Sequence, residues 1–203
     1  MRHGETDWNA AQRLQGHTDI ALNAAGRRQA RLLARALADE AFDAVYASDL
    51  ARARDTAAAF AGAALRLDAG LRERGFGAFE GLSYSEIDQR WPEEARRWRQ
   101  RDPLFAPAGG ETLADFHARC VAAADRLARR HPGQSIALVA HGGVLDSLYR
   151  AATGVALDAP RSWQLGNATI NRLLHTGEGF TLVGWNDAAH LEAAEAEGDQ
   201  NAL

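Results

Sequence analysis

Apolar residues along the chain switch repeatedly between the spacing of helices and the spacing of buried strands. In residues 23–38, apolar side chains recur every three or four positions with arginines between them, which predicts an amphipathic helix. Residues 135–140, Ser-Ile-Ala-Leu-Val-Ala, contain no charge, which predicts a strand buried on both faces. Repeated alternation of this kind is typical of an α/β fold.

Shorter segments extend the same pattern over the rest of the chain. Further strands are expected at residues 43–47, 65–67, 169–175 and 180–185, the last two forming a hairpin. Further helices are expected at residues 49–61, 83–101, 112–130 and 144–152. Gly62 is expected to end the first of these helices, and Thr112 with Asp115 to begin the third.

The composition fits one globular domain. The chain has 203 residues, of which 46% are hydrophobic and 25% charged, so it can bury a core. We expect a single domain over residues 1–190, with a helical lid at about 83–110 and a flexible tail at 191–203. A net charge of −4 argues against general binding to nucleic acid or anionic membranes. Without an apolar run of membrane-spanning length or a signal-peptide pattern, we expect a cytoplasmic protein.

The basic residues narrow the possible chemistry. All 23 residues counted as Lys or Arg are Arg. Without lysine, a Walker-type phosphate loop, a Schiff-base enzyme and a pyridoxal phosphate enzyme are excluded. Cys120 is the only cysteine and the histidines are scattered, so we expect neither a disulfide nor a metal, and no cofactor. Any phosphate site must therefore use guanidinium groups, backbone N–H groups or imidazoles.

Two histidine motifs suggest such a site. His3 lies in Arg2-His3-Gly4, and His141 follows the predicted strand 135–140 and precedes Gly142. Residues that follow parallel strands project into the crevice where α/β sheets bind ligands. A neutral imidazole can form a phosphohistidine, and an adjacent arginine offers planar donors for phosphate. Taken alone, the first motif fits an exposed terminal dipeptide equally well.

Two further residues fit phosphoryl chemistry. Arg52 lies in the first turn of the helix after strand 43–47 and can reach the same crevice, whereas Arg54 is interpreted as a surface residue. Glu73, in Leu-Arg-Glu-Arg-Gly, could donate a proton to a leaving alcohol. In isolation Glu73 would be an ordinary loop carboxylate.

Taken in order, the motifs resemble the histidine phosphatase superfamily, in its phosphoglycerate-mutase-like branch. The likeness covers nearly the whole chain and includes the following blocks: Arg2 to Thr6, Trp8-Asn9, Gly26 with Gln29-Ala30, Ser48 to Ala53, Glu73, Gly77 to Leu82, Gly109 to Thr112, and Ala140 to Gly142. The resemblance implies a three-layer α/β/α sandwich around a mostly parallel sheet, with no metal required.

The resemblance also implies roles for the residues. His3 matches the nucleophile that becomes phosphorylated, and Arg2, Arg52 and His141 match the clamp around the phosphoryl oxygens. Glu73 matches the general acid that protonates the leaving oxygen and then acts as base toward water.

Substrate contacts are implied more loosely. Asn9 matches a secondary phosphate contact, Gln15 and Gly16 line the entrance, and Gly142 follows the second histidine. Tyr84 stands near the start of the lid segment, and this segment is expected to contact the rest of a small phosphorylated metabolite.

The resemblance leaves hydrolysis and mutase activity open. Tyr84, Phe76, Gly143 and Gln15 stand where mutases usually carry groups for the far end of their substrate, which favours a phosphatase. The arginines of the lid, Arg96, Arg97, Arg99 and Arg101, could replace those groups and support an isomerase, although a solvated helix face is the favoured interpretation. A non-catalytic phospho-ligand binder is a third possibility, and a phosphohistidine-protein phosphatase is a less favoured fourth. The oligomeric state is not predicted.

The start of the chain differs from the family's pattern. Related chains place several apolar residues before Arg-His-Gly as a central strand, whereas only Met1 precedes Arg2 here. Either the start of the sequence is assigned downstream of the true one, or the first strand is truncated. A truncated strand would leave neighbouring backbone and apolar groups uncovered and orient His3 less firmly.

Overall fold

A parallel sheet between two helical layers organises the molecule. The computed structural model describes residues 1–61 and 65–200. Strand β1 (Ala44–Ala47) lies between β2 (Leu65–Leu67) and β3 (Ile136–Val139), and both pairings are parallel. Val45 stands opposite Leu65 on one side and Ala137 on the other. The expected α/β fold is confirmed.

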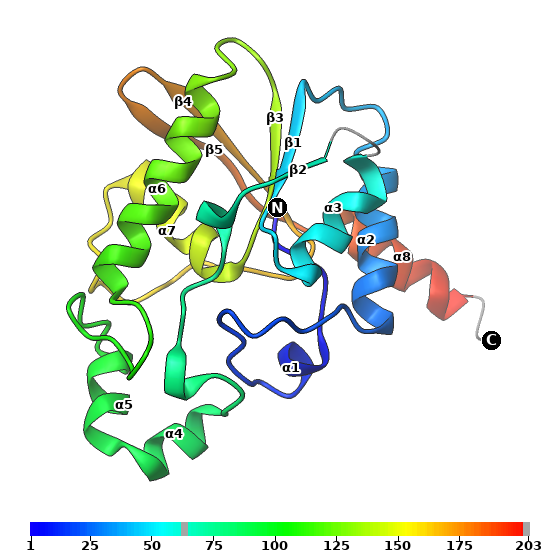
Figure 1. The fold of residues 1–203 in the computed structure, drawn as a ribbon. Helices are drawn as coiled ribbons and strands as arrows, with labels where there is room; N and C mark the ends of the chain where they lie inside the picture. The colour runs from blue at the N-terminus through cyan, green and yellow to red at the C-terminus, as the bar shows by residue number, and fades with distance from the viewer. Residues whose placement is uncertain (62–64, 201–203) are drawn as a thin grey trace.

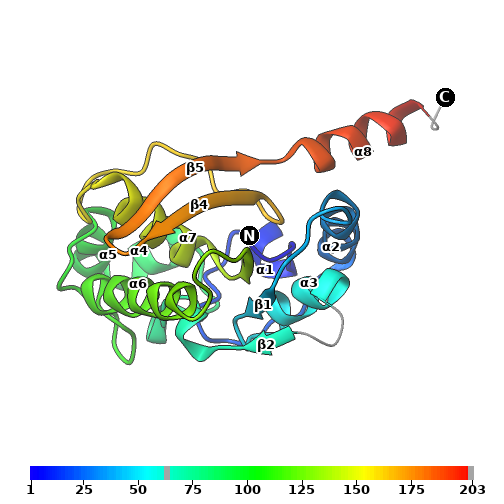
Figure 2. The same ribbon diagram turned by 90° about the horizontal axis from the view of Figure 1, so that it is seen from above.

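Alternate residues of β1 build the two layers. Ala44 and Tyr46 pack with the helices α6 (Leu113–Arg129) and α7 (Gly142–Thr153). Val45 and Ala47 pack with α2 (Ala24–Ala36) and α3 (Ala51–Ala61) on the opposite face. Figures 1 and 2 show the two helix pairs on opposite sides of the sheet. Because successive strand residues point to opposite faces, a run of four apolar residues serves both layers.

The carboxyl ends of the strands carry the connections that matter for function. Segments leading into α3 and α7 leave β1 and β3 at this edge, as do the 3-10 helices η2 (Ala69–Leu71) and η3 (Gly77–Phe79) after β2. The short α1 (Asp7–Ala10) follows the N-terminal segment and lies below the sheet in Figure 1. Strands β4 (Ile170–Thr176) and β5 (Gly179–Asp187) form the expected antiparallel hairpin.

The N-terminal residues form only the end of a strand. Arg2 makes a parallel bridge with Ala140, and the His3 N–H donates to the Ala140 carbonyl at 3.0 Å. On the other side, the Arg2 N–H donates to Thr169 at 3.4 Å. The segment therefore fills the space between β3 and β4 only at the edge where the sheet carries its connections.

A groove continues where this short segment ends. It measures about 600 Å³ and runs between β3 and β4, beside Met1, with residues of α6 and α7 on one wall. The amino group of Met1 lies buried in this region and donates to the Leu138 carbonyl at 2.7 Å. Both faces of β3 have apolar contacts, as predicted, but burial is complete on one face only: Ala137 and Val139 are buried, whereas Ile136 and Leu138, which border the groove and pack against the cluster under α6 and α7, are half-buried.

The predicted helix at 83–101 is two helices. Helix α4 (Tyr84–Arg90) ends at Trp91, and α5 (Pro92–Arg99) begins directly after it. Proline at 92 disfavours the helical conformation for Trp91, whose φ and ψ are −140° and 69°, so the helix breaks here. This segment packs around a separate apolar cluster of Phe79, Ile87, Ala95 and Phe105.

Other boundaries differ at the C-terminal end. Residues 191–200, assigned to a flexible tail from the sequence, continue helix α8 (Ala189–Gln200), which contacts α2. Alanine and glutamate favour helix strongly enough to extend it. Gly62, the predicted helix stop, lies outside the described residues, as do 201–203. No helix in the described segments combines the length and apolarity that a membrane crossing requires.

Candidate active site

A pocket of about 330 Å³ opens at the carboxyl edge of the sheet. The predicted site residues that line it are Arg2, His3, Asn9, Gln15, Arg52, Glu73, Tyr84 and Gly142. They come from the N-terminal segment, α3, the segment after β2, α4 and the start of α7. A pocket of this size suits a small metabolite. The structure therefore brings together residues that are up to 140 positions apart in the sequence.

His3 is held with one ring nitrogen available. The side chain is 3% exposed, and Nδ1 lies 2.6 Å from the Gly4 carbonyl oxygen. A carbonyl only accepts, so Nδ1 carries the proton and Nε2 keeps its lone pair. Burial, followed by the charges of Arg2 and Arg52, lowers the pKa of His3 well below its usual range. The imidazole is therefore neutral and suited to nucleophilic attack.

His141 offers a donor next to that nucleophile. Its ring centroid lies 5.1 Å from that of His3, and its Nδ1 accepts from Arg52 Nε at 3.2 Å. Burial, and then the charge of Arg52, lowers the pKa of His141 well below its usual range, so the proton sits on Nε2. That Nε2–H is buried and finds no hydrogen-bond partner among the described residues. It lies where α7 begins, and a helix N-terminus also favours an anion.

Two guanidinium groups, of the fully buried Arg52 and the half-buried Arg2, complete this side of the pocket. Arg52 is fully buried and donates to the carbonyls of Gly16 at 2.8 Å and Thr18 at 3.0 Å. Arg2 donates to the Leu165 carbonyl, and its buried Nε has no partner in the described segments. Within that same part of the chain, neither arginine forms an ion pair with a carboxylate. Burial lowers the pKa of Arg52 to about 10, still high enough to keep its charge at neutral pH. Two neighbouring guanidinium groups without a carboxylate partner favour binding of an anion.

Glu73 enters the pocket from the segment after β2. Its Oε1 accepts from the Arg74 N–H at 2.9 Å, and its Oε2 accepts from the Gly143 N–H at 3.0 Å. A Cβ at position 143 would lie 2.2 Å from Glu73 Oε1. Glycine at 143 is therefore required for this close approach, which the sequence alone does not indicate.

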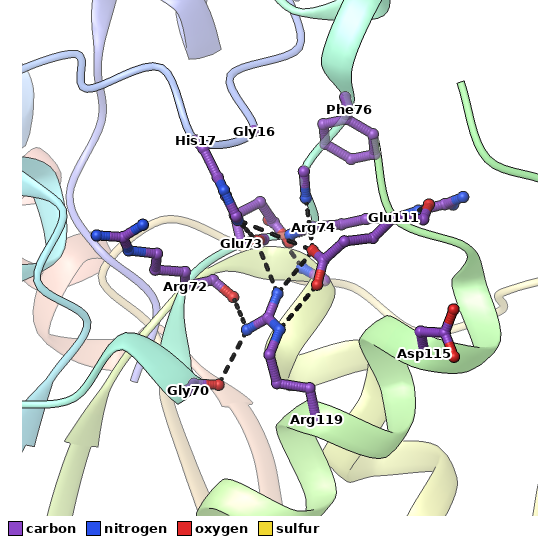
Figure 3. A network of polar contacts seen from close by, with 12 residues as sticks. Gly16, His17, Gly70, Arg72, Glu73, Arg74, Phe76, Glu111, Asp115 and Arg119 are labelled. Atoms are coloured by element: carbon purple, nitrogen blue, oxygen red, sulfur yellow. Dashed lines mark hydrogen bonds and ion pairs between the residues drawn. The ribbon is translucent and has the colours of Figure 1, made fainter. Parts of the chain in front are cut away.

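A polar network fastens the backbone that carries Glu73. Figure 3 shows Arg119 of α6 reaching toward this segment, where it donates to the carbonyls of Gly70, Arg72 and Glu73 at 3.0, 3.0 and 3.1 Å. The same guanidinium pairs with both carboxylate oxygens of Glu111 at 2.9 and 2.8 Å. His17, which was given no role from the sequence, donates from Nε2 to the Glu73 carbonyl at 2.8 Å.

The remaining predicted residues differ in how they meet the pocket. Asn9 Oδ1 accepts from the N–H and the hydroxyl of Thr6 at 3.1 and 3.0 Å, which leaves the amide nitrogen for a ligand. Gln15 is buried, and its Oε1 finds no partner in the described chain. Gly16 acts through its carbonyl on Arg52 and has a φ of +56°. Tyr84 is exposed and stacks on Trp98 with ring centroids 5.1 Å apart.

The lid arginines do not form one cluster. Arg96, Arg97 and Arg99 pair with Glu93, Asp102 and Asp88 on the surface, as a solvated helix face requires. Arg101 instead lines the pocket, so the surface interpretation is wrong for this residue. Trp98 also lines the pocket, whereas Trp91 packs against Phe79.

Several residues that sequence reasoning did not single out as pocket residues line it, namely Arg74, Asp146 and Arg161. No motif signals them, because each depends on a loop or helix face whose orientation only the fold determines. Cys120 is buried in the core. In residues 1–61 and 65–200, no three His, Cys, Asp or Glu side chains are grouped to hold a metal ion.

The chain is similar in sequence to proteins of one known family. The chain is 39% identical over 199 residues to phosphoglycerate mutase-like protein 4 of Arabidopsis thaliana, covering 95% of this chain and 85% of that protein. It is 34% identical to a metal-independent phosphoserine phosphatase of the same plant, covering 95% and 82% of the two chains.

Solved structures agree with these relatives. The Bacillus stearothermophilus protein YhfR superposes with a TM-score of 0.86 at 32% identity, covering 94% of this chain and 96% of the other. A phosphoserine phosphatase from Entamoeba histolytica in complex with 3-phosphoglyceric acid superposes with a TM-score of 0.84 at 27% identity, covering 94% and 96%. The family model of the histidine phosphatase superfamily (branch 1) matches residues 1–188. The chain therefore belongs to the histidine phosphatase superfamily.

Proposed function

We propose that this chain is a metal-independent phosphatase that hydrolyses a small phosphomonoester through a phosphohistidine on His3. The observation that carries the proposal is the buried neutral imidazole of His3, whose free Nε2 faces a pocket lined by the guanidinium groups of the half-buried Arg2 and the fully buried Arg52. The proposed enzyme is one domain over residues 1–190, with residues 83–110 as its lid. It needs no cofactor.

In the first proposed step, His3 Nε2 attacks phosphorus, and the bond from phosphorus to the ester oxygen breaks. Glu73 gives its proton to that oxygen, so the substrate leaves as a neutral alcohol. The two guanidinium groups and the Nε2–H of His141 stabilise the charge on the phosphoryl oxygens. The Asn9 amide supplies a further donor.

In the second step, water attacks the phosphohistidine and the phosphorus–nitrogen bond breaks. Glu73, now a carboxylate, takes the proton of that water. The products are inorganic phosphate and neutral His3, so the cycle closes without another reactant. The contacts of Glu73 with the N–H groups of Arg74 and Gly143 support this role, because they hold the carboxylate in the pocket.

A cofactor-dependent phosphoglycerate mutase is the second candidate. The relative named phosphoglycerate mutase-like protein 4 and the position of Arg101 in the pocket favour it. The relative named phosphoserine phosphatase favours hydrolysis. A non-catalytic phospho-ligand binder is supported by the same cradle without turnover.

Hydrolysis of p-nitrophenyl phosphate tests the proposal. We expect turnover that survives chelator treatment and falls roughly a thousandfold or more in His3→Ala, because the nucleophile is lost. His131→Gln is the matched control, since His131 bonds Tyr46 away from the pocket. Turnover that survives in His3→Ala would reject the phosphohistidine. Conversion of 3- to 2-phosphoglycerate that requires 2,3-bisphosphoglycerate would identify the mutase.

A further inference from the structure

Asp146 gives the pocket an acceptor that the phosphate chemistry does not use. It lies on α7 one turn after Gly142, which is about 6 Å along the helix. Its side chain is 6% exposed and lines the pocket. Oδ2 accepts from Arg101 Nη2 at 2.7 Å and from Arg150 Nε at 3.0 Å. Oδ1 is buried and has no partner among the described residues. A buried carboxylate oxygen is costly to leave unfilled, so this atom suits a ligand donor.

Arg101 provides the matching cation beside this acceptor. Its φ of +55° lies in the left-handed region, which residues other than glycine adopt rarely. The conformation turns the guanidinium from the end of α5 toward α7, where it donates to Asp146 and to the Leu157 carbonyl. These bonds use two of its five N–H groups, so donors remain for a ligand. Strained residues of this kind concentrate at binding sites.

The charges around the far end of the pocket favour an anion. Arg101, Arg161 and Asp146 all line the pocket. The Oδ2 atom of Asp146 already accepts from the guanidinium groups of Arg101 and Arg150. A ligand carboxylate would find free guanidinium donors, and a donor on the adjacent carbon would reach Oδ1. One helical turn separates this place from the phosphate cradle, a span that a three-carbon skeleton bridges.

We propose that Asp146 and Arg101 form a second subsite, which binds a carboxylate and an adjacent hydrogen-bond donor at the far end of the phosphomonoester. The inference rests on the proposed function, because it assumes that the phosphate lies against His3. Asp146 Oδ1 accepts from an ammonium or a hydroxyl of the substrate. Arg101 donates to the substrate's carboxylate. The preferred substrates are therefore phosphorylated amino or hydroxy acids, and simple alkyl phosphates are poorer.

The structural and the recognition roles of Asp146 can be separated. Its anchoring contacts to Arg101 and Arg150 use Oδ2 alone. In Asp146→Asn, the two guanidinium groups select the amide oxygen for that position and turn the amide nitrogen toward the ligand. The variant thus keeps the anchor and replaces the free acceptor with a donor. Arg101→Gly removes the guanidinium and suits the left-handed backbone, so it also folds.

The test compares kcat/KM for compounds that differ only at this end. The substrates are O-phosphoserine, 3-phosphoglycerate, 3-phosphooxypropanoate, which lacks the donor, and p-nitrophenyl phosphate. The wild type should prefer at least one of the first two over the third by about tenfold or more, the effect of one hydrogen bond to a charged group. Asp146→Asn should abolish this preference and should lower kcat/KM for p-nitrophenyl phosphate by a smaller factor than for the preferred carboxylate. Arg101→Gly should raise KM for the three carboxylates, and Arg101→Lys should restore part of it.

Controls and binding keep the outcomes distinct. Asp88→Asn and Arg99→Gln alter an exposed ion pair of the lid and should change no ratio. Calorimetry with the His3→Ala protein measures the affinity of the subsite without turnover. The ligands are inorganic phosphate and the three carboxylates. An ammonium preference and a hydroxyl preference both support the subsite and name the donor. Equal affinity for all three carboxylates, or an equal loss for every substrate in Asp146→Asn, would overturn it. Absence of all hydrolysis with the binding preference intact would reject the proposed function alone.

Discussion

At the scale of single residues, the site depends on close approaches that leave no room for a side chain. Gly143 is the sharpest case, because its N–H binds the carboxylate of Glu73 and its Cα faces the same group. The motif that contains His141 predicts a phosphate contact, but nothing in it indicates a contact with a carboxylate from another segment. At such positions the lack of a side chain allows another residue to approach the backbone.

We expect Gly143→Ala to displace Glu73 and to impair proton donation. A Cβ there would approach Glu73 Oε1 to 2.2 Å and Phe116 to 3.0 Å, so the carboxylate must move. For alkyl phosphates, whose leaving oxygen needs a proton, kcat should fall roughly a hundredfold. For p-nitrophenyl phosphate, whose leaving group is already stable as an anion, the loss should be smaller.

Steady-state kinetics with both substrates measures this difference. Gly177→Ala is the matched control, since a Cβ there would meet nothing within 4 Å. An equal loss for both leaving groups would show that the substitution disturbs the pocket generally and does not act through Glu73.

At the scale of elements, helix α6 positions the proposed acid through Arg119. The guanidinium crosses from α6 to three carbonyls of the segment that carries Glu73 and is itself held by Glu111. Backbone carbonyls in a segment without regular structure otherwise need water or other donors. The position of Glu73 therefore depends on α6, because Arg119 of this helix fixes the backbone that carries Glu73.

Replacing Arg119 with Met should therefore reduce kcat with little change in KM. The phosphate cradle of Arg2 and Arg52 stays intact, whereas a shift of the acid by about 1 Å costs roughly a hundredfold. Arg119→Lys should restore little, because one ammonium cannot match the fork that bonds several carbonyls. Arg129→Met, which breaks a surface pair on the same helix, should leave both constants unchanged. A rise in KM alone would contradict this role.

Much of the element order could be predicted from the sequence, for reasons visible in particular segments. Strand β1 and helix α2 follow from local periodicity, and the motifs around His3, Arg52 and His141 predict which strand ends meet. The helix break at Trp91 was missed although Pro92 signals it. The role of Asp146 could not be predicted, because it depends on which face of α7 borders the pocket.

At the scale of the whole molecule, the groove between β3 and β4 leaves a gap in the packing of the described residues. Apolar side chains line much of it, together with the charged Glu40 and Arg172, and the amino group of Met1 lies buried beside β3. Burial lowers the pKa of this amine from 8.0 to about 5. The unfolded chain therefore takes up a proton at a higher pH than the folded chain does.

We expect this difference to make stability depend on pH. The full contribution is present above pH 8, and it is lost as the pH falls toward 5, at about 1.4 kcal/mol per pH unit. An extension of about five β-branched residues before Met1 should fill the groove and convert the amine to an amide. The free energy of unfolding should rise by at least about 3 kcal/mol at pH 7, with a flatter pH profile between 5 and 8.

Urea unfolding at several pH values measures both effects. An extension of equal length made of glycine and serine is the control, since it removes the amine without supplying apolar side chains. It should flatten the profile and add little stability. Equal stabilisation by the two extensions would show that the groove does not accept a strand.

The separate apolar cluster of Phe79, Ile87, Ala95 and Phe105 has an evolutionary consequence. Because this cluster is separate from the two clusters that flank the sheet, we expect substitutions around Tyr84 and Trp98 to have little effect on the sheet that holds His3 and His141. Proteins that evolve from such a scaffold can change substrate through substitutions in the lid, while the residues that bind the phosphoryl group stay the same.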